Sequence, residues 1–340
     1  PGIRFQFKYS TRRGQDIITA RVVNDRTFEK RDWQRKAEFS IHQMKITLSG
    51  NFKDVRAQTT VVSDPTMDLL YHYSNVFSFG HNVGVGWSED GTKVWTDYIP
   101  RYEVPLMRQR KELQDLIPTL QDLVDPDKII SAVESIEDFI LKYEDWISSQ
   151  RDEFRSLEAI QHLGEHFEEN LENAEQNIGR MRSGVRTLLE DPVALEAFRL
   201  ANKSILLSQT SSTLEELHRI PNFQWRPFQF AFQLVNLDGV LKGAHDDRDI
   251  VDLAWFPTGG GKTEAYLGLI AILSFYRRLK PETAVLEQNG PAIHTIMRYT
   301  LRLLTADQAA RLVRAVGAMN TVAEDNEVGA SSGFPPFRVG

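Results

Sequence analysis

The sequence predicts a multidomain protein of the α+β class, and three observations support this prediction. Apolar residues alternate with polar ones in the first hundred residues, which is the period of a half-buried strand. In the second hundred, apolar residues recur every three or four positions, as in an amphipathic helix. Near residue 260 a glycine-rich loop stands between a short apolar run and a longer one, as between the strand and helix of an α/β layer. We therefore expect three parts, at residues 1–105, 106–203 and 204–340.

Composition narrows the class of protein further. The chain has 340 residues, of which 41% are hydrophobic, so it can bury more than one core. It has no cysteine, which excludes disulfides and thiolate metal sites and fits a reducing cytoplasm. No apolar run reaches the roughly 18 residues of a membrane span. The first residue is proline and no charged-then-apolar leader follows, so we expect that the true start of the chain has been lost.

The net charge of −7 is concentrated in one region. Residues 101–200 contain 22 Asp and Glu against 12 Lys and Arg, whereas the rest of the chain contains 25 acidic and 28 basic residues. The charge of the whole chain is therefore a poor guide to any one binding face, and it does not exclude a nucleic-acid partner.

Residues 1–105 are expected to form an antiparallel β domain. Ile3, Phe5, Phe7 and Tyr9 alternate with polar residues. A second alternation over residues 39–48 shifts by one position, which predicts a bulge. The segment "SEDGTKVWTDYI" at 88–99 predicts a turn that is followed by a strand.

Residues 106–203 are expected to be helical and acidic. Asp125 and Pro126 have the order of an N-cap and a first helical residue, and Asp191 and Pro192 repeat it. After the first pair, one apolar stripe contains Ile129, Val133, Ile136, Ile140, Tyr143 and Ile147. The glutamate-rich stretch 150–190 predicts a solvated helical face, with an acidic protein-docking surface as the alternative.

The third part contains the glycine loop, in "WFPTGGGKTEAYLGL" at 255–269. The run 250–256 predicts a strand, and the run 264–279 predicts a buried helix. Glycines let backbone N–H groups approach a polyphosphate closely, and the helix adds its positive N-terminal end. We expect Lys262 to contact the β- and γ-phosphates of ATP and the Thr263 hydroxyl to bind Mg²⁺, which makes these two the catalytic residues.

The nucleotide site is assigned to the loop and the first turn of the helix. The predicted nucleotide-binding residues here are Thr258, Gly259, Gly260, Gly261, Lys262, Thr263 and Glu264. Phe256 departs from the usual pattern, which has a small residue five positions before the last glycine. A purely structural glycine turn is the alternative, but it gives no reason for Lys262 and Thr263.

Two motifs resemble those of superfamily-two helicases. "PTGGGKTE" is similar to their motif I, and "WRPFQ" at 225–229 is similar to their Q-motif. The resemblance implies a RecA-like lobe with a parallel sheet, in which Gln229 reads adenine and Phe228 and Arg226 support the base. A buried aromatic helix with an incidental glutamine is the alternative.

Residues 292–320 are expected to begin as a strand and end as a helix. Their position matches motif Ia, which contacts the nucleic-acid backbone in helicases. The resemblance assigns DNA contacts to Arg298, Arg302, Thr305 and Gln308, and Arg311 and Arg314 add charge that is compatible with phosphates. Thr305 and Gln308 fit a capping box equally well, and the arginines could instead be solvated.

A narrower resemblance extends over residues 77–314. The segments "FSFGHNVGVGW", "AFRLAN", "WRPFQFAFQL", "FPTGGGKTEAYLGL" and "IMRYTLRLLTADQAAR" together resemble the DrmA family, the helicase-like subunits of bacterial DISARM anti-phage systems. The resemblance implies a cytoplasmic, ATP-dependent DNA helicase or translocase that works with a partner subunit resembling DrmB.

The chain lacks parts that such a motor needs. We find no DExH-type carboxylate motif and no second lobe with an arginine finger, so we expect ATP hydrolysis only from a longer protein. Two other functions stay open: a scaffold that binds ATP and a partner protein without translocating, and another P-loop ATPase of the AAA type. The "WRPFQ" segment disfavours the latter.

Overall fold

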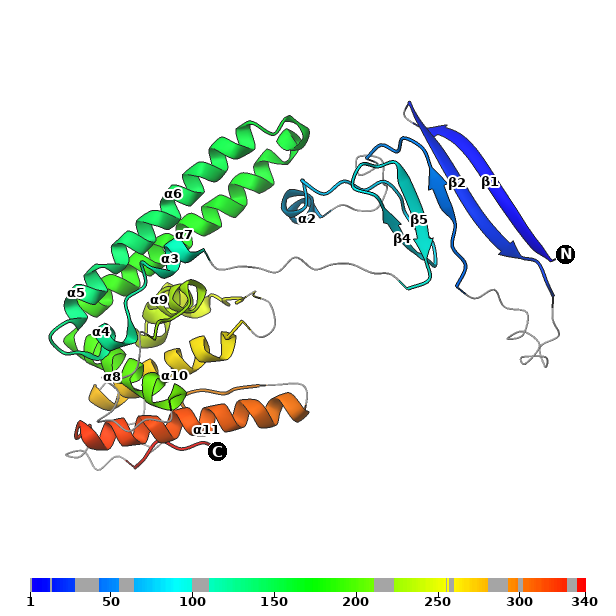
Figure 1. Ribbon diagram of the computed structural model, residues 1–340. Helices are drawn as coiled ribbons and strands as arrows, with labels where there is room; N and C mark the ends of the chain where they lie inside the picture. The colour runs from blue at the N-terminus through cyan, green and yellow to red at the C-terminus, as the bar shows by residue number, and fades with distance from the viewer. Residues whose placement is uncertain are drawn as a thin grey trace. The chain divides into compact units, whose positions relative to one another are not determined.

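The structure is a computed structural model. It describes residues 2–12, 14–27, 43–54, 64–99, 110–210, 223–254, 256, 260–280, 293–298, 302–328 and 335–340. The chain divides into two compact units, Pro1–Leu106 and Met107–Gly340, which are treated separately below (Figure 1).

The first unit contains two small antiparallel sheets. Its described elements are β1 (Ile3–Arg12), β2 (Gln15–Asn24), β3 (Thr47–Ser49), α2 (Pro65–Leu70), β4 (Gly84–Trp87) and β5 (Lys93–Asp97). Strands β1 and β2 form a hairpin, and the other sheet has the order β3-β5-β4. The predicted antiparallel strands at 3–9 and within 88–99 are confirmed. Of the predicted alternation at 39–48, residues 39–42 lie outside the described residues and a strand begins only at Thr47.

The β1–β2 hairpin has one apolar face that is exposed. Because paired residues of an antiparallel ribbon share a face, the register places Phe5 with Val22 and Tyr9 with Ile18 on one side. The side chains of Phe7 and Tyr9 are 60% and 65% exposed. The strand prediction is therefore right, but the predicted half-burial is wrong, because no second layer among the described residues covers this face.

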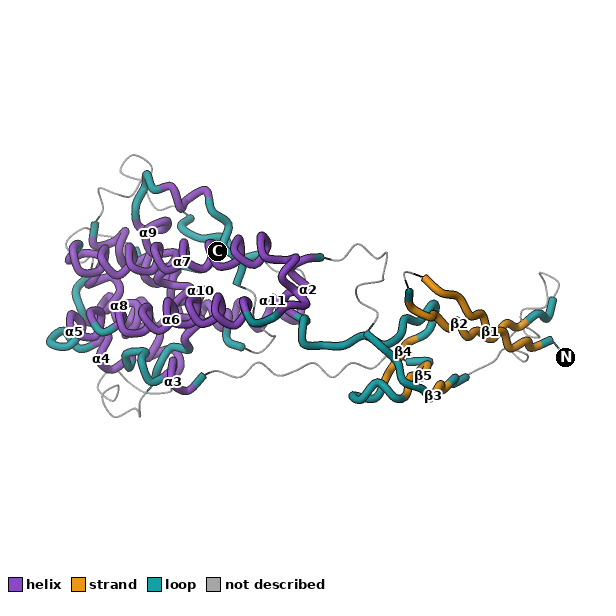
Figure 2. The backbone as a smooth tube through the Cα atoms, turned by 90° about the horizontal axis from the view of Figure 1, so that it is seen from above, coloured by secondary structure: helices purple, strands orange, loops and turns teal. Residues whose placement is uncertain are grey.

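The second unit is helical in its described part. Its helices are α3 (Lys111–Gln114), α4 (Leu120–Val124), α5 (Ile129–Glu134), α6 (Ile136–Arg155), α7 (Gly164–Glu190), α8 (Pro192–Gln209), α9 (Pro227–Leu241), α10 (Lys262–Leu279) and α11 (Arg302–Asp325). Short 3₁₀ turns lie at Glu158–Leu163 and Asp246–Asp249. Helices α6 and α7 run as a long pair at one side of the unit (Figures 1 and 2).

The two Asp-Pro pairs, at 125–126 and 191–192, were both expected to begin helices, but they differ in the structure. Asp191 is the N-cap of α8, and its carboxylate accepts hydrogen bonds from the backbone N–H of Val193 and Ala194. Asp125 follows the end of α4, and its carboxylate accepts from the N–H of Asp127, so it caps the turn that leads into α5, which begins at Ile129. The stripe that follows Asp125 is nevertheless buried at Ile129, Val133, Ile136, Ile140 and Ile147.

Helix α8 is central to one shared hydrophobic core. It packs against α4, α7, α10 and α11, and the rings of Phe198, Phe230 and Phe275 are fully buried. Helices from both predicted ranges, 106–203 and 204–340, thus contribute to this core. Within the described part of the chain, no helix combines the length and the apolarity that crossing a bilayer requires.

A buried carboxylate joins α7 to α9. Asp238 on α9 accepts hydrogen bonds from the hydroxyls of Ser183 and Thr187 on α7, and Lys242 forms an ion pair with it at 2.9 Å. Burial opposes ionisation of Asp238, but these hydrogen bonds outweigh it and hold its pKa below the usual range. Asp238 therefore fixes how the two helices are aligned.

The described residues of the third part do not show the expected parallel sheet. Residues 250–254 are extended but pair with no strand among the described residues, and residues 293–298 are extended and unpaired likewise. Val251 and Leu253 are 94% and 85% exposed. The strand predictions at 250–256 and at the start of 292–320 are thus wrong for the described residues, because a strand forms only with neighbours that supply its hydrogen bonds.

Candidate nucleotide-binding site

The "WRPFQ" segment forms the start of α9. Pro227 is the first helical residue, where its missing N–H leaves no hydrogen bond unmade. The backbone N–H of Arg226 donates to the Gln229 side-chain oxygen at 2.9 Å, so Gln229 closes the first turn. The Gln229 side chain is buried, whereas Arg226 lies at the surface.

The same two side chains hold the end of the glycine loop. The Gln229 amide nitrogen donates to the carbonyl of Gly261 at 2.6 Å, and the Arg226 guanidinium donates to the carbonyl of Gly260 at 2.8 Å. The two motifs, about thirty residues apart in the sequence, are therefore in direct contact. Both ends of the Gln229 amide are used inside the protein, so its role here is to support the loop.

Gly261 has a backbone conformation that favours glycine. Its φ is +84°, in the left-handed region, and it is the N-cap residue of α10. A Cβ at this position would lie 2.6 Å from the Gln229 amide nitrogen. A side chain here would therefore strain the backbone and displace Gln229 as well.

The predicted catalytic residues lie at the start of α10. This helix begins at Lys262, and Thr263 and Glu264 follow in its first turn. The unpaired N–H groups of a first turn and the helix dipole favour an anion at this end. The Lys262 ammonium donates to the backbone carbonyl of Phe256, so it lies folded over the loop. Thr258 and Gly259 lie outside the described residues.

Phe256, which replaces the usual small residue of the loop, stacks on Phe228. The two rings are 4.0 Å apart between centroids and 13° from parallel. This contact joins the beginning of the loop to α9, as the Gln229 and Arg226 hydrogen bonds join its end. The departure of Phe256 from the common pattern thus has a packing reason, which the sequence alone did not show.

Glu264 connects the loop region to α11. One of its carboxylate oxygens accepts from the Arg311 guanidinium at 2.7 Å, and Arg311 also donates to Asp307 at 3.0 Å. The other carboxylate oxygen of Glu264 is buried with no hydrogen-bond partner among the described residues. The spacing of the sequence gave no sign of this link between α10 and α11.

The predicted DNA-contacting residues are divided between the segment 293–298 and helix α11. Arg298 is exposed on the extended segment 293–298, and the side chain of Arg302 lies outside the described residues. Thr305 lies inside α11, which begins at Arg302, so it is not the N-cap residue of this helix. Thr305 is exposed and Gln308 half-buried.

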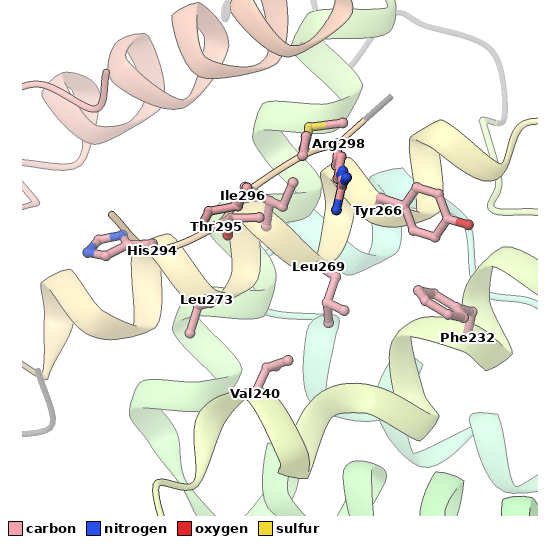
Figure 3. A pocket seen from close by; sticks show the side chains of 11 residues that line it. Phe232, Val240, Tyr266, Leu269, Leu273, His294, Thr295, Ile296 and Arg298 are labelled. Carbon is pink, nitrogen blue, oxygen red and sulfur yellow. The ribbon is translucent and has the colours of Figure 1, made fainter. Parts of the chain in front are cut away.

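An open groove lies between α9, α10 and the segment 293–298 (Figure 3). Its volume is about 700 Å³. Apolar side chains from the two helices form its floor, and Arg298 and His294 lie along its rim. Burial, together with the nearby Arg277 and Arg278, lowers the pKa of His294, so its neutral form is favoured.

Comparison with known proteins agrees with the resemblance to the DrmA family. No family model matches the sequence. A DISARM protein DrmA from Bacillus paralicheniformis is 32% identical over 297 residues, which cover 80% of this chain and 26% of that relative. The chain is DrmA-like. The chain spans about a quarter of the length of that curated relative, and its glycine loop is held by contacts with α9.

Proposed function

We propose that this chain carries the ATP site of a DNA-dependent motor, helicase-like or translocase-like, in a cytoplasmic anti-phage complex of the DISARM type. The observation that carries the proposal is the direct contact of Arg226 and Gln229 with the carbonyls of Gly260 and Gly261. A residue set suited to a base and a loop suited to phosphates thus lie within one nucleotide's length.

The residues at the start of α10 fit a magnesium nucleotide. The left-handed Gly261 keeps the loop free of a Cβ, and the buried Glu264 oxygen is a polar atom without a partner among the described residues. We propose that the N–H groups of residues 260–263 and the Lys262 ammonium bind the phosphates, and that the Thr263 hydroxyl binds Mg²⁺. Bound Mg²⁺ would neutralise charge on the phosphates during hydrolysis.

Two side chains must change partners for this role. Lys262 has to exchange the Phe256 carbonyl for phosphate oxygens, and Gln229 has to exchange one of its two internal hydrogen bonds for the edge of adenine. Phe228, which is half-buried, is proposed to pack against the base. Each exchange replaces one hydrogen bond with another, so its net cost is about 1 kcal/mol or less.

DNA binding and partner binding are proposed from the resemblance and from charge. Arg298, Arg302, Thr305 and Gln308 follow α10 in the sequence and are proposed to contact the phosphodiester backbone. A subunit resembling DrmB is the proposed protein partner. The scaffold alternative is favoured by one observation, the exposed apolar face of the β1–β2 hairpin, which suits a protein contact.

Substitution of Lys262 tests the ATP site. In the full-length protein, Lys262→Ala should weaken ATP binding at least about tenfold, or about 1.4 kcal/mol, because the ammonium opposite the phosphates is lost. DNA-stimulated hydrolysis and phage protection should fall together. Lys142→Ala, at an exposed position on α6, is the matched control and should leave both unchanged. Loss of hydrolysis with intact protection would favour the scaffold.

A further inference from the structure

The ion pair between Glu264 and Arg311 links two helices that have few other contacts. Among the ion pairs of the described residues, it is the one that joins α11 to α10. The main packing partner of α11 is α8, and its far end is held there by Lys203 and Asp325 at 2.7 Å. Arg311 is therefore placed to transmit the position of α11 to the first turn of α10.

The orientation of the Glu264 carboxylate indicates that the link acts on the glycine loop. Arg311 binds one oxygen of Glu264, which fixes how the carboxylate is turned. The second oxygen lies 3.2 Å from where a Cβ of Gly261 would be, so it faces the glycine loop. It is buried and has no partner among the described residues. A buried carboxylate oxygen is rarely left unpaired without a functional reason.

The unpaired oxygen matches the needs of a hydrated magnesium ion. Mg²⁺ keeps several of its waters when it binds to protein and nucleotide, and those waters donate hydrogen bonds to nearby carboxylates. Glu264 follows Thr263, the proposed direct ligand, by one residue. An ion pair that only joined the two helices would not require a second, unpaired carboxylate oxygen beside the loop.

We propose that Arg311 is a positioning residue that acts through Glu264: it orients the carboxylate so that the free oxygen accepts from the water shell of Mg²⁺ at the nucleotide. This inference rests on the proposed function. A displacement of the N-terminal half of α11, which contains Arg311, turns the carboxylate and weakens binding of the magnesium nucleotide. The position of α11, which carries the predicted DNA-contacting residues Arg302, Thr305 and Gln308, is in this way coupled to the nucleotide site.

The test is calorimetric titration of the full-length protein with a non-hydrolysable ATP analogue, with Mg²⁺ and with EDTA. Arg311→Gln should weaken binding about tenfold with Mg²⁺ and leave binding in EDTA unchanged. Glu264→Gln should do the same, and the double variant should be no weaker than Glu264→Gln, because the two residues act in series. Arg311→Lys should restore part of the affinity.

Lys203→Gln provides the matched control, because it releases the other end of α11 without approaching the loop. It should lower the melting temperature and leave nucleotide affinity unchanged. The inference is overturned if Arg311→Gln binds as wild type does, if its loss is equal in EDTA, or if Lys203→Gln weakens binding as much. If the wild-type protein binds no nucleotide, the proposed function fails and this inference with it.

Discussion

Helix α10 and the segment 250–254 flank the same glycine loop, but only one of them is packed. On α10, Ile272 and Phe275 are completely buried, whereas Val251 and Leu253 before the loop are 94% and 85% exposed. A helix satisfies its backbone hydrogen bonds within itself and needs only a packing surface, which α8 and α9 provide. An extended segment needs partners from elsewhere in the chain. The structure of α10 thus depends mainly on hydrogen bonds within the helix, whereas that of the segment 250–254 depends on residues elsewhere in the chain.

Truncation of a buried ring on α10 should have the largest effect and tests this comparison directly. Phe275→Ala removes a fully buried ring from the core shared by α8 and α10 and should lower the free energy of unfolding by about 3–5 kcal/mol. Val251→Ser, before the loop, should change it by less than about 0.5 kcal/mol. Urea unfolding followed by circular dichroism measures both. A large effect of Val251→Ser would mean that the segment is packed in solution, and the contrast would be lost.

A side chain on Gly261 should have the next largest effect. Gly261→Ala forces a left-handed residue and contacts Gln229, so we expect a loss of about 2 kcal/mol in the free energy of unfolding. Gly243 has open space where a Cβ would lie, so Gly243→Ala is the control and should cost less than about 0.5 kcal/mol. Equal values for the two variants would show that the loop is not held as the structure describes.

The smallest effect is expected where the extended segment is anchored. Asp252 forms two hydrogen bonds of 2.7 Å with Arg180 on α7, and Arg180 also binds Asp247. Asp252→Asn should cost about 1 kcal/mol, because Arg180 keeps its second carboxylate. Hydrogen exchange should speed up at Ile250, whose N–H donates to the carbonyl of Asp247, and stay unchanged in α10. Faster exchange in α10 as well would mean that the two sides of the loop unfold together.

The same contrast explains how much of the fold could be predicted. The helices around Ile136 and Phe198 and the cap at Asp191 follow from spacing and capping chemistry, both of which are local properties of the sequence. Strand β1 was predicted from its own alternation, whereas its partner β2 was not predicted, although it is adjacent in the sequence. Pairing and burial of Val251 depend on distant segments, and the sequence pattern alone carried no information on them.

For the candidate site, the residue types were predictable but their contacts were not. The glycine loop and the "WRPFQ" segment were both assigned to one site, and Gln229 and Gly261 do meet. That Gln229 supports the loop through both ends of its amide could not be read from spacing. Neither could the stack of Phe228 on Phe256 or the ion pair of Glu264 with Arg311, since each joins residues that are far apart in the sequence.

The exposed apolar face of the β1–β2 hairpin affects the solubility expected of the first unit. Ile3, Phe5 and Phe7 form an exposed apolar strip along one side of the ribbon, which has two strands among the described residues. Two-stranded ribbons are marginally stable in water. Exposed aromatic faces also tend to associate with one another. A fragment of residues 1–106 prepared by itself should therefore precipitate readily, and polar replacements at Phe5 and Phe7 should keep it in solution.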